Sequence, residues 1–539
     1  MPTFSSWLLI AAAAAAHGYL VWHRLLAYLR YLQQEGYEHI RFLRWTHARS
    51  LSDPAFWLSI TGAWLYPRWP TAVTMGVVVA MVLLARAQPD PRRSGKITLK
   101  MTWRARRVQA IAFLIATAIW VGLATVLVGV AAGPMLLASV IVYAVIPFVL
   151  VAANTCLRPY ERHIQRQYEA EAVRRVADLQ PFVIGITGSY GKSSSKAILA
   201  HILQFHGPTL AAAGSINTLM GVTRHIREAL VPGHVFMVVE MGAFQTGSIA
   251  RLCQLTPPSA ALITAVGDMH LERFGSLDAI VRAKGELAAA LPPDGLLVVN
   301  ADSPGALRIA QNTRGRRILL YGETSTEDLD TRLEQVEFST TGTAFVLRTR
   351  NDVYRCTTPL LGRPIVLNLA GAFTLACAVG VDPAVAVAAI TTLRPVSNRL
   401  EVVKESGVTW IRDAYNSNQA GFRAALEVVA ALPVARRFIA TPGVIELGAE
   451  QFAVNRTLAR EAAAVCDTAL VVADTNREAF LTGYRDAGCE DRLVSVPSRA
   501  AAFRWLRETV REGDAVILEN DLPDLYEPAG VFWKTVSRG

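Results

Sequence analysis

The sequence lacks paired cysteines and internal repeats, and acidic residues are scarce in its first third. The six cysteines are scattered through 539 residues without a C-x-x-C pair. This spacing argues against a zinc site and favours free thiols in a reducing compartment. No internal repeat is visible, so the chain does not read as a repeat array. Because the chain is too long for one hydrophobic core, we expect two or three domains.

The scarcity of acidic residues makes the first third of the chain basic. Residues 1–180 hold 19 Lys and Arg against 8 Asp and Glu, whereas the rest holds 35 against 36. The excess positive charge lies between apolar runs, which is typical of cytoplasmic membrane loops and argues against nucleic-acid binding. The apolar runs are Trp7–Val21, Phe56–Leu65, Ala72–Leu84, Ile111–Ala132 and Met135–Ala153.

These runs predict a membrane region at residues 1–156 with about five transmembrane helices. The last two runs are long enough to span a bilayer, which takes about 17–25 residues. If the two basic stretches, residues 24–49 and 86–107, both face the cytoplasm, the part of the chain after residue 156 lies there too. We therefore expect a multi-pass protein of the inner (cytoplasmic) membrane, followed by a juxtamembrane linker helix at residues 157–180. Two alternatives stay open: the second and third runs could form one buried or interfacial element, and the linker could be a plain solvated helix.

From residue 181 onward, short apolar strands alternate with helical patterns, which predicts an α/β fold with parallel sheets. We expect a central domain at residues 181–395 and a smaller, Rossmann-like C-terminal domain at residues 396–539. The predicted strands are Val183–Thr187, Val235–Glu240, Ala260–Thr264 and Leu296–Asn300, then Val408–Asp413, Arg437–Thr441, Ala469–Ala473 and Ala515–Glu519. A turn-rich, β-like stretch at Arg317–Leu360 precedes a helical run at Leu367–Gly380.

The first predicted strand runs into a glycine-rich turn that is typical of phosphate-binding loops. The segment from Val183 to Lys196 reads VIGITGSYGKSSSK. Glycines let backbone N–H groups approach a phosphate, and a helix that begins at the lysine adds positive charge there. The lysine can reach the β- and γ-phosphates, and the serine after it can bind Mg²⁺. The candidate nucleotide-binding residues are Gly188, Ser189, Gly191, Lys192, Ser193 and Ser194. An ordinary glycine-rich turn is the alternative, because Ile186 stands where the full P-loop pattern has glycine.

Three further residues follow predicted strands or helices at the same end of the expected sheet. Glu240 ends the strand FMVVE, where open α/β sheets bind ligands, and could hold a metal ion. His270 follows the strand ALIT, and Lys284 lies on the next predicted helix. Each also has a structural interpretation on its own: a helix cap, a core histidine and a solvated lysine.

Taken together, the order and spacing of these segments resemble the Mur ligase family, which forms amide bonds in peptidoglycan precursors at the expense of ATP. The likeness covers about residues 181–539. The matching segments are TGSYGKSS, VVEMGA, Thr264–Glu272, Ala283–Glu286, LNLAGA, SNRLEV and RDAYNSNQ. The resemblance implies ATP and Mg²⁺ as cofactors, with Lys192, Glu240, His270 and Lys284 as catalytic residues. It implies Ser193, Glu240 and His270 as metal ligands, and a carbamylated Lys284. It also implies that Asn368, Arg399 and Asp413 contact the nucleotide.

The segment DAYNSN and the later Glu446-Leu447-Gly448 most resemble the branch that adds D-alanyl-D-alanine to a UDP-muramoyl tripeptide. Several positions depart from the family pattern: Ala265 and Thr218 replace asparagines, and Gln419 replaces a common proline. The K-G-S motif near the C-terminus is absent, and Glu519–Asp524 occupies its place. Apolar segments stand where the family has its soluble UDP-sugar-binding domain.

The resulting hypothesis is a membrane-anchored, ATP-dependent ligase that works through an acyl phosphate. Its substrates would be a cell-wall precursor, with a lipid-linked form as one option, and an amino acid or dipeptide. Nucleic acid is not an expected partner. A poly-γ-glutamate-synthase-like ligase and a catalytically weak scaffold for cell-wall synthesis are the alternatives.

Overall fold

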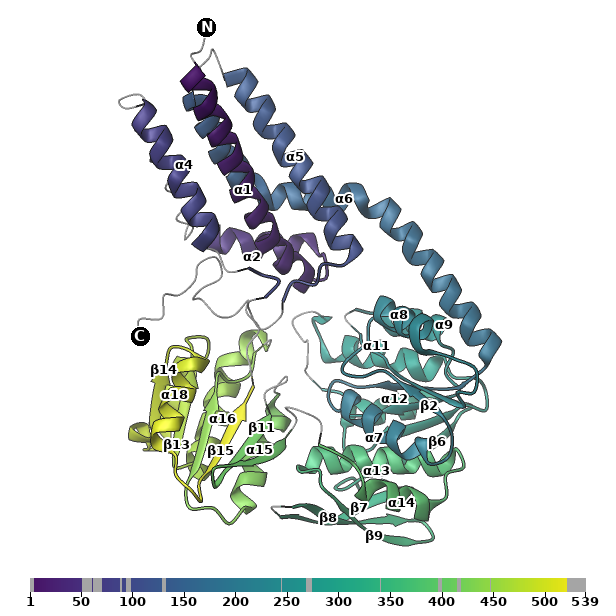
Figure 1. Cartoon of the computed structure of the whole chain (residues 1–539). Helices are drawn as coiled ribbons and strands as arrows, with labels where there is room; N and C mark the ends of the chain where they lie inside the picture. Colours follow the sequence, from purple (N-terminus) through teal and green to yellow (C-terminus); the bar gives the residue numbers. More distant parts are fainter. Residues whose placement is uncertain are drawn as a thin grey trace. The chain divides into compact units, whose positions relative to one another are not determined.

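The structure is a computed structural model, and it describes residues 4–50, 61, 70–87, 90–93, 98–127, 132–243, 245–267, 274–339, 341–395, 400–413, 418–445 and 447–520. The chain forms two compact units that divide between Ile164 and Gln165. The first unit is helical, and the second holds two β-sheets with their covering helices (Figure 1).

The helices of the first unit pack their apolar side chains against one another. They are α1 (Phe4–Gln34), α2 (His39–Ser50), α4 (Pro70–Ala87), α5 (Trp103–Leu127) and the first part of α6 (Ala132–Leu179). Helix α1 contacts both α4 and α5. Leu25, Leu29, Val108 and Leu150 are fully buried in the common core. Part of the apolar side chains of this region therefore serve packing between helices.

The prediction of a multi-pass inner-membrane protein is wrong. Among the described residues, only Trp103–Leu123 of α5 is long and apolar enough to cross a bilayer, and one such helix is weak evidence. Part of the apolar residues that suggested further crossings line the helical core. Others, among them Met75, Val79 and Leu83 of α4, are exposed. The predicted run Phe56–Leu65 lies almost wholly outside the described residues.

The predicted linker helix at residues 157–180 is the C-terminal part of the 48-residue α6, which contains Pro147 and Pro159. From Gln165 onward it belongs to the second unit. Ala172 is fully buried there, and the Arg175 side chain donates to the Leu230 carbonyl at 2.7 Å. One side of this helix packs at Ala172 and Val176, while most of its other side chains are exposed.

The predicted α/β alternation of the central domain is confirmed. Its strands and helices alternate as β1 (Phe182–Thr187), α7 (Lys192–Gln204), β2 (Thr209–Ala211), α8 (Leu219–Ala229), β3 (Phe236–Glu240), α9 (Ser248–Leu255), β4 (Ala260–Ile263), α11 (Leu277–Ala289), β5 (Leu296–Asn300), α12 (Pro304–Asn312) and β6 (Arg317–Gly322). The strands are parallel in the order β2-β3-β1-β4-β5-β6. They are almost wholly buried, as strands covered on both faces must be.

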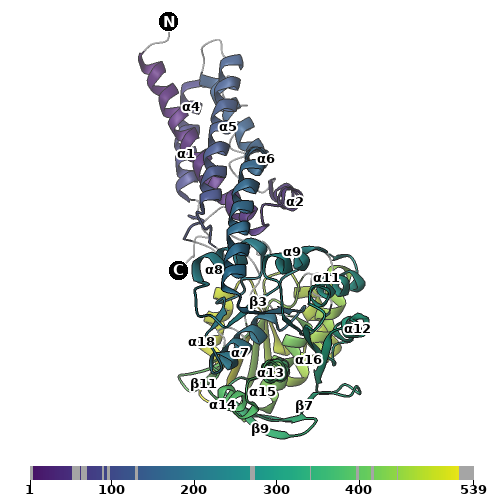
Figure 2. The same cartoon turned by 90° about the vertical axis from the view of Figure 1, so that its right-hand side faces the viewer.

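The turn-rich stretch after β6 extends the same sheet. Strand β7 (Thr331–Ser339) pairs parallel with β6, and β8 (Gly342–Thr349) and β9 (Val353–Thr358) follow as an antiparallel edge. Helices α13 (Arg363–Ala378) and α14 (Pro383–Thr391) complete the domain. Helix α13 packs beside α7, and both helices contact strands of the sheet (Figure 2).

The C-terminal domain is built on a second sheet of six strands. Its strands and helices are β10 (Glu401–Glu405), β11 (Val408–Asp413), α15 (Gln419–Ala431), β12 (Arg437–Thr441), α16 (Gln451–Val465), β13 (Thr468–Val472), α17 (Arg477–Asp486), β14 (Leu493–Val496), α18 (Arg499–Thr509) and β15 (Ala515–Glu519). The order is β10-β11-β15-β12-β13-β14, and only β10 pairs antiparallel. The four strands predicted here are found within one residue of their predicted ends.

Candidate functional site

The glycine-rich loop joins the carboxyl end of β1 to the N-terminus of α7. Gly191 is the N-cap residue of α7 and has a left-handed φ of 82°, which disfavours any residue with a side chain. A Cβ on Gly191 would also lie 2.5 Å from Oδ1 of Asn368, so the predicted nucleotide contact on α13 lies directly against the loop. As at every helix N-terminus, the first N–H groups of α7 have no acceptor carbonyl within the helix. They can therefore donate hydrogen bonds to an anion.

The loop is tied to the end of β4. The backbone N–H groups of Ser189 and Tyr190 donate to the Ala265 carbonyl at 2.7 and 3.3 Å. The Thr264 hydroxyl donates to the Tyr190 carbonyl at 2.5 Å, and the Ser189 hydroxyl donates to the Gly267 carbonyl at 3.0 Å. Ala265, which departs from the family pattern in its side chain, therefore serves the loop through its backbone.

Two lysines converge on the loop. The Lys192 ammonium donates to the carbonyls of Gly188 and Ser189 at 2.7 and 3.0 Å. Lys284 on α11 donates to the same Gly188 carbonyl at 2.9 Å. Burial, and then repulsion from Lys192, hold the pKa of the Lys284 amine well below its ordinary value of 10.5. A buried lysine of this kind is neutral more often than a surface lysine, and a neutral amine can add CO₂ to form a carbamate.

Glu240 at the end of β3 is the centre of a polar cluster. The Ser193 hydroxyl donates to its Oε2 at 2.8 Å, and the Asn217 amide donates to its Oε1 at 3.0 Å. The Ser215 hydroxyl lies 3.0 Å from that of Ser193. These are the oxygen donors that a hard cation such as Mg²⁺ prefers, so the residues present fit the metal. In the described part of the chain, no group of three or more His, Cys, Asp or Glu side chains could bind a metal ion.

Lys196 is the member of this cluster that the sequence interpretation missed. Its ammonium lies 3.4 Å from Oε2 of Glu240, and both side chains are almost completely buried. It also donates to the Gly214 carbonyl. The signal was present in the sequence, because Lys196 follows Lys192 by one helical turn and must share its face of α7.

The remaining predicted site residues are placed only in part. His270 and Arg399 lie outside the described residues. Asp413 ends β11 in register with Glu519 of β15, and its Oδ1 accepts the Leu400 N–H at 3.4 Å. Burial raises the pKa of Glu519 well above 4.5, against the hydrogen bond from the Thr441 hydroxyl. The nucleotide contact of Asp413 stays a prediction.

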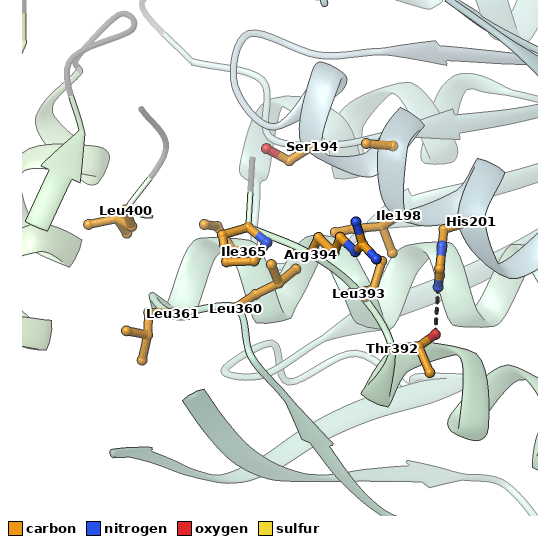
Figure 3. Close-up of a pocket in the computed structure, with 12 residues that line it drawn as sticks. Ser194, Ile198, His201, Leu360, Leu361, Ile365, Thr392, Leu393, Arg394 and Leu400 are labelled. Atoms are coloured by element: carbon orange, nitrogen blue, oxygen red, sulfur yellow. Dashed lines mark hydrogen bonds between the residues drawn. The ribbon is translucent and has the colours of Figure 1, made fainter. Parts of the chain in front are cut away.

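A cavity of about 500 Å³ lies beside the helix that follows the loop (Figure 3). It begins at Ser194 and follows the face of α7 along Ile198 to His201, whose Nε2 lies 2.8 Å from the Thr392 hydroxyl. The opposite wall is apolar, with Arg394 at one side. The other lining residues are Ala197, Leu360, Leu361, Ile365, Leu393, Pro395 and Leu400. The cavity thus combines apolar walls with the polar side chains of Ser194, His201 and Arg394.

Comparison with known proteins agrees with this geometry. The model of the Mur ligase middle domain matches residues 186–376, and that of the Mur ligase, glutamate ligase domain matches residues 398–519. The UDP-N-acetylmuramoyl-tripeptide–D-alanyl-D-alanine ligase of Escherichia coli (strain K12) is 32% identical over 274 residues, which are 51% of this chain and 60% of that protein. The enzyme of the same name from Mycobacterium tuberculosis (strain CDC 1551 / Oshkosh) is 31% identical over 62% of this chain and 70% of its own length.

The fold is also similar to a solved structure. MurF from Acinetobacter baumannii superposes with a TM-score of 0.60 and 26% identity, over 66% of this chain and 77% of that one. The chain thus spans between three fifths and about three quarters of the length of these relatives.

Proposed function

Because the chain belongs to the Mur ligase family, whose members form amide bonds with ATP and Mg²⁺, we propose that it joins D-alanyl-D-alanine to a UDP-muramoyl tripeptide. The names of the most similar relatives supply these substrates. The observation that carries the proposal is the convergence of Lys192, Lys284 and the Ser193–Glu240 pair around one loop. This set of groups suits phosphoryl transfer, which depends on positioning and charge stabilisation.

The proposed residue roles follow from where each group lies. Lys192 and the N-terminus of α7 hold the β- and γ-phosphates, while the cavity beside α7 receives the adenine ring. Ser193 and Glu240 would hold Mg²⁺, which when bound neutralises charge on the phosphates. Lys284, as a carbamate, would add a second carboxylate-like group near the loop.

The reaction would have two steps. A carboxylate oxygen of the tripeptide attacks the γ-phosphorus, the bond to the β-phosphate oxygen breaks, and ADP leaves. The amine of the dipeptide then attacks the acyl carbon, and the phosphate leaves as the amide forms. The amine loses its proton to solvent, so the products are amide, ADP, phosphate and one proton.

ADP release by the purified full-length chain tests the function. We expect turnover with UDP-muramoyl tripeptide, D-alanyl-D-alanine, ATP and Mg²⁺ together, and none when any one is omitted. Parallel reactions replace the nucleotide precursor with its lipid-linked form, and the dipeptide with single amino acids including glutamate.

Turnover restricted to the lipid-linked precursor would contradict the proposed acyl substrate, and turnover restricted to glutamate would favour a poly-γ-glutamate-type ligase. If no mixture releases ADP above the background of a Lys192→Ala variant, the ligase proposal fails and the scaffold alternative replaces it.

A further inference from the structure

The two faces of the C-terminal sheet are covered unequally. Helices α15, α16 and α17 pack with one face through a core that includes Phe422, Leu458 and Phe480. On the other face, the described residues place a single helix, α18, over β13 and β14 (Figure 1). The β10–β11 end of this face has no helix above it in the described part of the chain. A groove is the result.

This groove, which we call the arginine groove, has a cavity volume of about 620 Å³. Its floor is the exposed face of β11 and β15, and one wall is α18. It is lined by Glu405, Ser406, Val408, Trp410, Arg412, Arg499, Phe503, Arg507, Val510, Arg511, Glu512 and Leu518. Four arginines thus stand against two glutamates, so the groove is locally basic.

Three of these arginines have few acidic neighbours among the described residues. Arg412 lies 3.9 Å from Glu405, at the limit of an ion pair. Arg511 donates to the carbonyls of Glu508 and Val510. Arg507 is exposed on α18 and makes no ion pair within the described residues. Guanidinium groups gathered in this way favour phosphate, which they bind through paired N–H groups.

Two aromatic rings stand inside the same groove. The rings of Trp410 and Phe503 are inclined by only 20°, and their centres lie 6.5 Å apart. Nearly parallel aromatic rings in one groove offer flat faces on which a planar base can stack. The Arg499 guanidinium lies 5.3 Å from the Phe503 ring centre, which places a cation beside these rings. A planar base next to a phosphate would satisfy both features.

The net charge of residues 181–539 favours a small nucleotide over a nucleic-acid polymer as the ligand of this groove. Residues 181–539 hold 35 Lys and Arg against 36 Asp and Glu, and a polymer needs many phosphate contacts. We propose that the arginine groove binds the nucleoside diphosphate of the cell-wall precursor, with the base against the Trp410 and Phe503 rings and the phosphates on the arginines. The choice of UDP rests on the proposed function, because the names of the relatives specify a UDP-linked precursor.

Equilibrium dialysis of UDP against the full-length chain tests this site without turnover. All proteins carry Lys192→Ala, so that the glycine-rich loop does not contribute. We expect UDP to bind this background, and Arg507→Glu to weaken binding at least tenfold, about the loss of one central arginine contact. Arg504→Glu is the matched control, because Arg504 is exposed on α18 and does not line the groove. Its Kd should stay within about twofold of the background.

Two further measurements distinguish binding of the base from binding of the phosphates. Phe503→Leu keeps an apolar wall but removes one ring, so it should weaken UDP binding and leave pyrophosphate binding unchanged. Equal losses in Arg507→Glu and Arg504→Glu, or no UDP binding at about 1 mM, would overturn the proposal. Pyrophosphate binding as tight as UDP, or a thymidine oligonucleotide binding more tightly than UDP, would overturn it too. Because no step of this assay requires amide formation, its failure leaves the ligase proposal standing.

Discussion

Replacing Lys192 by alanine is expected to lower kcat/KM for ADP formation by about 100- to 1000-fold, the usual loss when one preorganised charge-stabilising donor is removed. The ammonium lies at the mouth of the loop and is the cation best placed to follow the γ-phosphate as its charge changes. The protein should remain folded, because this side chain donates to backbone carbonyls of the loop and is not part of the hydrophobic core. Steady-state ADP release with saturating acyl substrate and amine measures the effect.

Lys404→Ala is the matched control for that measurement. Lys404 is an exposed lysine on β10, and its removal should leave kcat/KM unchanged. If Lys192→Ala keeps more than half of the activity of the unmodified chain, the glycine-rich loop does not hold the phosphates.

Replacing Lys196 by methionine is expected to destabilise the central sheet by about 3–5 kcal/mol, because it leaves the Glu240 charge buried without its cation. Both side chains are at most 3% exposed, so solvent screens this pair little. Hydrogen exchange of the β3 amides in the folded protein measures the local free energy. Adding Glu240→Gln to the Lys196→Met chain should restore most of the loss, since it removes the unpaired charge. An unchanged exchange rate in Lys196→Met would show that the pair carries no net stabilisation.

Lys284→Met is expected to have the opposite effect on stability. The surroundings of Lys284 lower its pKa and so disfavour its charged form. Between its folded-state pKa and 10.5, the unfolded chain binds a proton that the native chain does not, so native stability rises with pH in that window. At neutral pH the lysine therefore costs stability. Lys284→Met should slow hydrogen exchange at α11 and remove this pH dependence, while Lys196→Met accelerates exchange at β3.

The sequence predicted the strands and the glycine-rich loop well because buried parallel strands are short, continuous apolar runs. Val183–Thr187 and Arg437–Thr441 coincide with β1 and β12 to within one residue. The spacing of Lys192 and Lys196 places both on one face of α7, but the pairing of Lys196 with Glu240 could not be predicted, since it depends on how α7 packs over β3. Glu286 shows the same limit: beside the predicted Lys284, it accepts the Gly247 and Ala250 N–H groups and caps α9.

In the N-terminal region, composition led to the wrong prediction of a multi-pass membrane protein. Apolar runs and arginine-rich loops fit membrane helices, yet the same alternation arises when amphipathic helices bury one face in a shared core. Leu25 and Leu29, one turn apart on α1, are both fully buried among neighbouring helices. Periodicity within α1 carries no information on whether lipid or another helix covers that face.

Transfer of oxygen from the acyl substrate to phosphate tests the central claim most directly. UDP-muramoyl tripeptide labelled with ¹⁸O in its terminal carboxylate is converted with ATP and D-alanyl-D-alanine, and the released phosphate is analysed by mass. An acyl phosphate requires that one carboxylate oxygen leave with the phosphorus, so each phosphate should carry one ¹⁸O. Amide formation with unlabelled phosphate would contradict the proposed chemistry at this site.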